Sequence, residues 1–166
     1  MLLDLKNIIR TPGLSLPFAF SMDLSDFEWN GECPTPNPVE VDGTVRNMAG
    51  ALVLSCRLST TLSLTCDRCM KAFSEEKEVA YETLLATELE QEDNDDIVLL
   101  EDDKLDAGEL LRDVFILAMD SKNLCSEDCK GLCCGCGVDL NVEQCRCRKE
   151  IDPRLAALAK FFEQDS

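Results

Sequence analysis

The stretch LVLSCRLSTTLSLTC, Leu52 to Cys66, decides the fold class because its large apolar side chains alternate almost strictly with smaller polar ones. Leu58, Leu62 and Leu64 share one parity along it. A period of two, enriched in Thr and Val, is typical of an antiparallel strand that buries one face. We therefore expect a long, half-buried strand that ends at a cysteine.

Neighbouring stretches repeat this pattern. LSLPFAFSMDL alternates from Leu14 to Leu24, and VEVDGTVRNM follows a proline-rich spacer. AFSEEKEVAYETLLA, Ala72 to Ala86, sets Val79 and Tyr81 against charged neighbours; we favour a strand there over a helix that begins near Glu82. The first half of the chain is therefore predicted to be an antiparallel β-rich region.

An acidic run and a helix come next. We interpret ELEQEDNDDIVLLEDDKLD, Glu88 to Asp106, as a solvated loop, with IVLL as a short strand and a docking segment for a basic partner as the alternatives. Asp106 with Glu109 three residues later resembles a capping box and predicts a helix start. The expected core face of that helix is made of Leu110, Leu111, Val114, Leu117 and Ala118.

A cysteine-rich segment and a short helix close the chain. Asp152 can cap the helix DPRLAALAKFF, and Pro153 suits its first position. We expect an α+β protein with two parts. Residues 1–123 would form the β-rich domain with its acidic linker and packed helix, and residues 124–166 would hold the cysteine-rich knuckle and the terminal helix.

Composition limits the function. The 166 residues carry a formal net charge of -17, with 11 cysteines and no histidine. Such an acidic surface repels a phosphate backbone, so direct RNA binding is disfavoured and a basic protein partner is favoured. Asp4 and Lys6 interrupt the apolar N-terminus, which argues against a signal peptide. No apolar stretch is long enough to span a membrane. We expect a cytoplasmic protein, whose thiols stay reduced.

Eight of the cysteines form close pairs: Cys66 with Cys69, Cys125 with Cys129, Cys133 with Cys136, and Cys145 with Cys147. A C-x2-C turn converges two sulfurs, and Gly137 suits the position after the second cysteine. Cys125 and Cys129 are four apart, as on one side of a helical turn. Four pairs can combine into two four-thiolate sites in three ways. Contiguity favours a local site from the last two pairs and a long-range site from the first two.

Structural zinc is the preferred interpretation of these pairs. A redox dithiol would use one C-x2-C near a βαβ pattern, and no such pattern is visible. The cysteine spacings differ from those of the common iron–sulfur motifs. Catalytic zinc is often bound by His, which this chain lacks. Cys33, Cys56 and Cys134 are left over. Cys56 is interpreted as a small buried residue, and Cys134 could compete as a ligand.

LTCDRCMKAF, CSEDCKGLCCGCGVDLNVEQCRC and DPRLAALAKFF together resemble the YceD-like family of large ribosomal RNA subunit accumulation proteins. The resemblance implies a non-enzymatic role in accumulating large-subunit ribosomal RNA. This chain departs from the family's pattern at Cys134, where proline is usual. Many members lack the C-terminal knuckle, which implies that this knuckle is not essential to the shared role.

Three functions remain open. The first is a non-enzymatic factor in large-subunit ribosome biogenesis that contacts a basic ribosomal protein or ribosomal RNA maturation factor. Without His, a Ser-His-Asp set cannot exist, and no nucleotide-binding glycine loop is present. The second is a zinc-ribbon RNA-binding module, and the third is a thiol oxidoreductase or zinc-responsive protein that uses Cys66 and Cys69. The basic edge of the second would be Arg146, Arg148, Lys149 and Arg154.

Overall fold

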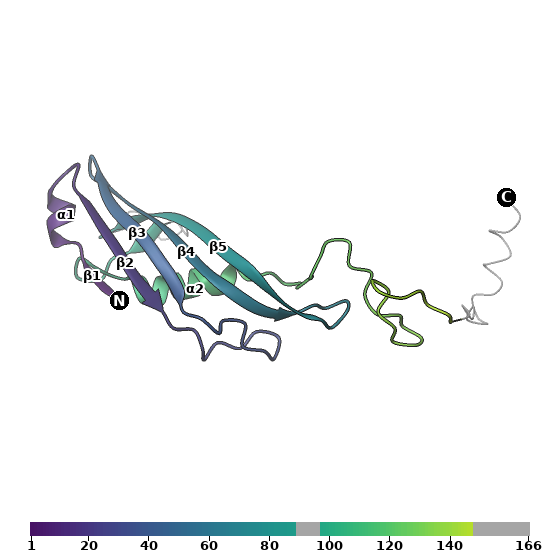
Figure 1. The fold of residues 1–166 in the computed structure, drawn as a ribbon. Coiled ribbons are helices and arrows are strands. Elements are labelled where there is room, and N and C mark those ends of the chain that lie inside the picture. Colours follow the sequence, from purple (N-terminus) through teal and green to yellow (C-terminus); the bar gives the residue numbers. More distant parts are fainter. Residues whose placement is uncertain (89–96, 148–166) are drawn as a thin grey trace, which may run out of the picture.

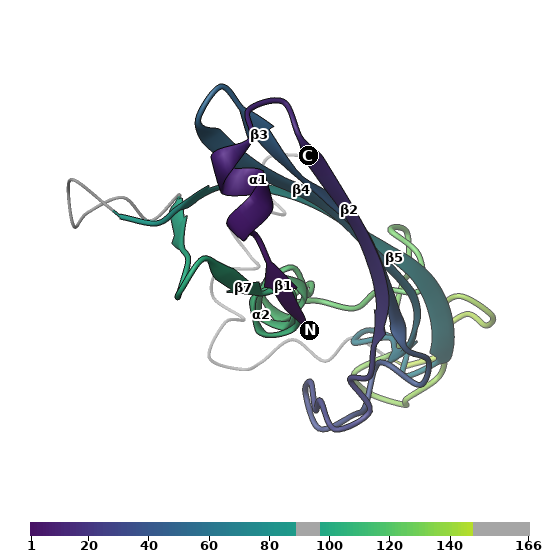
Figure 2. The ribbon, with the colours of Figure 1, turned by 90° about the vertical axis from the view of Figure 1, so that its left-hand side faces the viewer.

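A curved sheet dominates the computed structural model, which describes residues 1–88 and 97–147 (Figures 1 and 2). Its strands lie in the order β2-β3-β4-β5-β6, antiparallel except for the parallel pair β5–β6. The strands are β2 (Ser15–Met22), β3 (Val39–Met48), β4 (Ala51–Thr65), β5 (Ala72–Ala86) and β6 (Ile97–Leu99). The described residues are mostly sheet with two helices, which is consistent with the predicted α+β class.

The alternation of apolar and polar residues along the strands determines which face of the sheet is buried. Leu54, Leu58, Leu62 and Leu64 on β4 are all buried, as is Cys56 in the same parity, whereas the odd-numbered residues between them are exposed or half-buried. Successive side chains of a strand point to opposite faces, so one parity lines the core. The strand predicted at Ala72–Ala86 is confirmed as β5. Figure 2 shows the sheet curving around α2 (Ala107–Leu117), which lies on its concave side.

Helix α2 begins as predicted but buries the predicted face only in part: Leu111 is completely buried, as expected. The Asp106 carboxylate accepts hydrogen bonds from the backbone N–H groups of Gly108 and Glu109, which caps the helix start. Phe115, absent from the predicted core face, is completely buried, whereas the predicted Leu117 is 85% exposed. The residues that α2 and the turn after it bury recur every fourth position: Ala107, Leu111, Phe115 and Met119.

The predicted loop from Glu88 to Asp106 is partly wrong. Its described second half forms β6, which confirms the short strand suggested for IVLL, and a further short strand, β7 (Lys104–Asp106). Strand β7 pairs with β1 (Leu2–Asp4), which precedes α1 (Lys6–Arg10). The loop interpretation fails there because Leu100 and Leu105 are buried in the core among acidic neighbours. Residues 89–96 of the run lie outside the described residues.

The N-terminal segment packs against the same core. Leu5 is completely buried and Ile8 nearly so. Within the described part of the chain, no helix is both long and apolar enough to cross a membrane. The predicted helix from Asp152 lies outside the described residues.

Candidate metal centres

The first candidate centre begins in the turn between β4 and β5. Strand β4 ends at Thr65, and β5 begins at Ala72, directly opposite it. Inside the turn, the N–H of Met70 donates to the carbonyl of Cys66, and the N–H of Cys66 donates to the carbonyl of Lys71. These bonds fold the chain so that the sulfurs of Cys66 and Cys69 converge.

The other two sulfurs of this centre come from the segment that follows α2. Cys125 and Cys129 lie in a tight turn in which the Cys129 N–H donates to the carbonyl of Ser126. The predicted helical turn is therefore wrong, since no helix forms here. The Arg68 guanidinium donates to the carbonyl of Cys129 at 2.8 Å, which fixes this segment against the hairpin.

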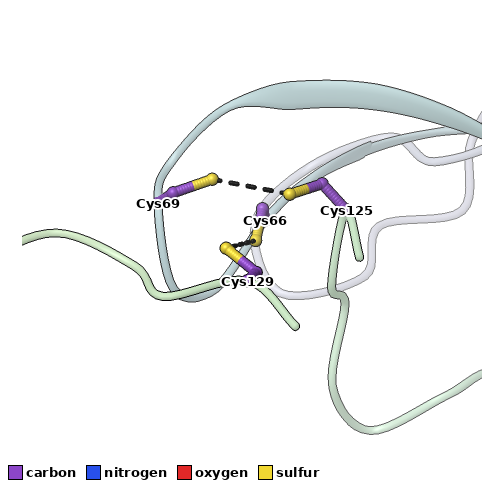
Figure 3. Close-up of side chains that lie close together, drawn as sticks. All are labelled: Cys66, Cys69, Cys125 and Cys129. Carbon is purple, nitrogen blue, oxygen red and sulfur yellow. Dashed lines mark hydrogen bonds between the residues drawn. The ribbon is translucent and has the colours of Figure 1, made fainter. Parts of the chain in front are cut away.

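The four sulfurs face one another (Figure 3). The Sγ atoms of Cys66 and Cys129 lie 3.9 Å apart, those of Cys69 and Cys125 lie 3.6 Å apart, and all four lie within 4.8 Å of one another. Tetrahedral zinc with Zn–S bonds of about 2.3 Å sets sulfurs about 3.8 Å apart. Since all but Cys125 are buried, this group could hold a metal ion shielded from water.

The second group is local and more open. Cys133, Cys136, Cys145 and Cys147 also place their sulfurs within 4.8 Å of one another. The Sγ of Cys145 lies 3.1 Å from that of Cys133 and 3.9 Å from that of Cys136. Three of these residues are exposed, and Cys133 is half-buried. This group could also hold a metal ion, in a setting open to solvent.

The two C-x2-C turns share one backbone pattern. In the second turn, the Gly137 N–H donates to the carbonyl of Cys133, and the Cys133 N–H donates to that of Val138. These are the same relative positions as in the Cys66 turn. After the second cysteine, Gly137 has φ +72° and Met70 has φ +59°. The predicted role of Gly137 is confirmed; Met70 holds the same left-handed conformation at a steric cost.

Electrostatics inside each group favour a bound cation. Backbone N–H groups, first that of Cys125, lower the pKa of Cys66 to about 6, while contact with the Cys69 sulfur raises the pKa of Cys125 to about 12. The second group repeats this split. The Cys136 N–H lowers the pKa of Cys133 to about 6, and the Cys136 sulfur raises that of Cys147 to about 12. Four sulfurs this close cannot all be thiolates without a counter-charge, which a dication supplies.

Gly131 brings the two groups together. Its φ is +73°, and a Cβ there would lie 2.8 Å from the carbonyl oxygen of Arg68. That oxygen also accepts the N–H of Leu132 at 2.9 Å. The link between the two cysteine groups therefore runs directly against the first turn, and any side chain at this position would push them apart.

Replacing Gly131 with alanine is expected to lower the free energy of unfolding by more than the about 1–3 kcal/mol that a left-handed non-glycine residue costs. Gly137→Ala is the matched control, since its φ is +72° and a Cβ there meets nothing within 4 Å. Denaturant unfolding and exchange of the Leu132 amide measure the difference. Equal losses in the two variants would show that the close approach to Arg68 contributes nothing.

The structure gathers all eight paired cysteines in the grouping that contiguity favoured; their role as ligands stays a prediction. Cys56 is buried and the pKa of its thiol is raised to about 11 by desolvation, which fits its interpretation as a core residue. Cys33 and Cys134 are exposed and belong to neither group.

Two supporting residues have no signal in the sequence pattern. Arg68 holds the Cys125–Cys129 turn as described above, and Asn141 donates to the Cys129 sulfur at 3.4 Å. Asn141 also accepts the N–H of Lys130 through its side-chain oxygen. In the sequence, Arg68 is only one polar residue inside a C-x2-C pair, and Asn141 is only one residue of a polar loop, so neither is marked as a contact of the cysteine group. Such outer contacts orient ligands.

A curved sheet whose longest hairpin ends in one of two four-cysteine groups defines a class of β-rich proteins with candidate structural metal sites. The chain belongs to the family described as large ribosomal RNA subunit accumulation protein YceD, whose model matches residues 54–162. The matched range includes both cysteine groups. The family name implies a role in the accumulation of large-subunit ribosomal RNA.

The similar proteins carry names that describe them as uncharacterised. The chain is 26% identical over 160 residues to the uncharacterised protein YlbN of Bacillus subtilis, covering 94% of this chain and 93% of that protein. It is 25% identical over 132 residues to an uncharacterised protein of Mycobacterium tuberculosis, covering 77% of this chain and 64% of that protein's length. The same figures hold for an uncharacterised protein of Mycobacterium bovis. No solved structure matches.

Proposed function

We propose that this protein is a non-enzymatic cytoplasmic factor that supports the accumulation of large-subunit ribosomal RNA by binding a basic protein. Its membership of the YceD family across both cysteine groups is the observation that carries the proposal. The partner would be a large-subunit ribosomal protein or a maturation factor. In this proposal the protein supplies a shaped, acidic surface.

The charge of the chain supports a protein partner over naked RNA. The net charge is -17, and residues 75–106 hold 14 acidic residues against Lys77 and Lys104. Clustered negative charge repels phosphate and attracts basic proteins, with an association rate that falls as salt rises. Of the basic edge suggested for an RNA-binding module, only Arg146 is among the described residues.

Structural zinc is the cofactor we propose, one ion for each cysteine group. Four soft thiolates in a tetrahedral arrangement suit zinc or an iron–sulfur cluster, and the spacings favour zinc. Cys66, Cys69, Cys125 and Cys129 would hold one ion, and Cys133, Cys136, Cys145 and Cys147 the other. A site with four protein ligands has no open position for substrate, which accords with a role in folding.

Depleting the protein from cells is expected to lower the amount of large-subunit ribosomal RNA relative to small-subunit ribosomal RNA. A tagged copy is expected to capture basic large-subunit proteins at near-physiological salt, and less of them as salt rises. Quantitative RNA analysis and mass spectrometry of the captured material make the two measurements. A rescued strain that carries the untagged protein controls for indirect effects.

Binding of the purified protein to ribosomal RNA fragments distinguishes the proposed protein-binding factor from the alternative, an RNA-binding module. Micromolar or tighter binding that is lost in the triple variant Arg146→Gln, Arg148→Gln, Lys149→Gln would replace this proposal with the RNA-binding module. Reactive thiols at Cys66 and Cys69 in protein purified with its metal would instead favour the redox function.

A further inference from the structure

The sheet ends in β2 on one side and in the short β6 on the other, so that most of the edge of β5 beyond β6 is left open. Strand β6 pairs with β5 only along Leu84–Ala86. From Ala72 to Glu82, the outer edge of β5 has no strand partner among residues 1–88 and 97–147. Unpaired edges are templates for another extended chain.

Hydrogen bonds show which β5 residues face that edge. The N–H of Leu100, just after β6, donates to the carbonyl of Ala86, whereas the N–H of Cys66, just after β4, donates to the carbonyl of Lys71. Backbone groups alternate in direction along a strand. Even-numbered residues of β5 therefore present their N–H and C=O groups to the open edge, and odd-numbered residues present theirs to β4. The outward-facing set is Ala72, Ser74, Glu76, Glu78, Ala80 and Glu82.

The opposite edge carries a proline in an outward-facing position. The Asn47 N–H donates to the carbonyl of Leu14 just before β2, so even-numbered residues of β2 face β3. Pro17 is therefore among the residues that face outward, where it removes a donor. Proline on an edge strand is a common device against unwanted pairing. Strand β5 contains no proline, so its edge keeps every donor.

Side chains on the two faces of β5 indicate what would fit. On the outer face, Glu76, Glu78 and Glu82 are exposed. Glu78 pairs with the exposed Arg57 at 2.9 Å, and Glu82 accepts a hydrogen bond from Ser55. The inner face of β5 beside the same edge is mainly apolar. There Phe73, Val79 and Tyr81 are half-buried and contact the core, and Lys77 pairs with Asp120.

We propose that the open edge of β5, Ala72 to Glu82, binds an extended basic segment of a partner protein as an added strand. Backbone hydrogen bonds would hold the segment, as in other cases of strand addition. Its basic side chains would lie over Glu76, Glu78 and Glu82, and its apolar side chains over Val79 and Tyr81. A second copy of this chain fits poorly, because pairing β5 with itself would bring like charges together.

This inference rests on the proposed function and adds the place and manner of partner binding. Ala80 and Ala19 offer a matched pair of test positions. Both are exposed, both present their N–H to an outer edge, and they lie at opposite ends of one cross-strand row through Asp42 and Arg57. Ala80→Pro removes one donor from the β5 edge, and Ala19→Pro removes one from the β2 edge. Neither breaks a bond within the sheet.

The probe is a seven-residue blocked peptide of alternating arginine and valine, titrated against the full chain purified with its metal. We expect binding that protects the Glu76 and Glu78 amides from hydrogen exchange. We expect binding at least tenfold weaker in Ala80→Pro and unchanged in Ala19→Pro. A peptide with glutamate in place of arginine should not bind. Circular dichroism of both variants checks that they are folded.

Three results would overturn the inference: no binding of the arginine peptide, equal weakening by both proline variants, or equal binding of the glutamate peptide. A dimer seen by light scattering and abolished in Ala80→Pro would assign the edge to a second copy instead. If Ala80→Pro captured large-subunit proteins as well as the wild type does, the β5 edge would be refuted as the binding site and the proposed function would stand. Failure of the wild type to capture any would refute the proposed function.

Discussion

Replacing Cys66 with serine is expected to abolish metal binding at the first cysteine group and to detach the segment after α2 from the β4–β5 hairpin. Cys66 is completely buried and begins the turn that sets two sulfurs in place. Binding free energy in a small structural site is also folding free energy, and zinc sites of this kind contribute about 10–16 kcal/mol. Hydrogen exchange should show lost protection at the Leu132 amide, because its N–H donates to the carbonyl of Arg68 in the hairpin.

Cys136→Ser is the matched control, because it removes one thiolate from the second, exposed group. Its effect should be confined to residues near 133–147 and should leave the β-sheet amides protected. If the whole chain lost protection in Cys136→Ser, the division into two independent groups would be wrong. The boundary between 123 and 124 stays a prediction that the same exchange data test.

Replacing Phe115 with alanine is expected to lower the free energy of unfolding by about 3–5 kcal/mol, the usual cost of removing a buried phenylalanine side chain. Phe115 is completely buried in the core beneath the sheet. Denaturant unfolding in buffer containing zinc provides the measurement, so that the cysteine groups stay loaded in every variant.

Leu117→Ala is the control for that experiment, since the Leu117 side chain is 85% exposed on the same helix. It should change the free energy of unfolding by no more than about 0.5 kcal/mol. A larger loss for Leu117→Ala than for Phe115→Ala would mean that α2 buries the face first expected from the sequence and that the observed packing is wrong.

The long strands could be predicted because their signal is strong and local. Strand β4 alternates over 15 residues, and β3 spans the predicted VEVDGTVRNM. The helix start was equally visible, because an aspartate cap acts on the residues next to it. Which face of α2 is buried could not be predicted in the same way. Leucines and other apolar residues occur on most sides of this helix, so periodicity alone could not distinguish Leu117 from Phe115.

Short and long-range features carried less signal. Strands β6 and β7 have three residues each, too few for a clear period among acidic neighbours, so the strand at IVLL could be given only as an alternative and β7 was not foreseen. The grouping of Cys66 and Cys69 with Cys125 and Cys129 followed from contiguity of the other two pairs. The contacts that hold it in the structure, from Arg68, depend on tertiary placement and cannot be predicted from spacing.

Metal stoichiometry tests the account of the cysteine groups most directly. Protein purified without added metal, examined by elemental analysis and native mass spectrometry, should carry about two zinc ions per chain, as two four-thiolate sites require. Cys66→Ser and Cys136→Ser should each carry about one. Three results would contradict the account. The wild type could carry no metal, it could carry iron with visible absorbance, or it could carry a single zinc ion that both variants lose.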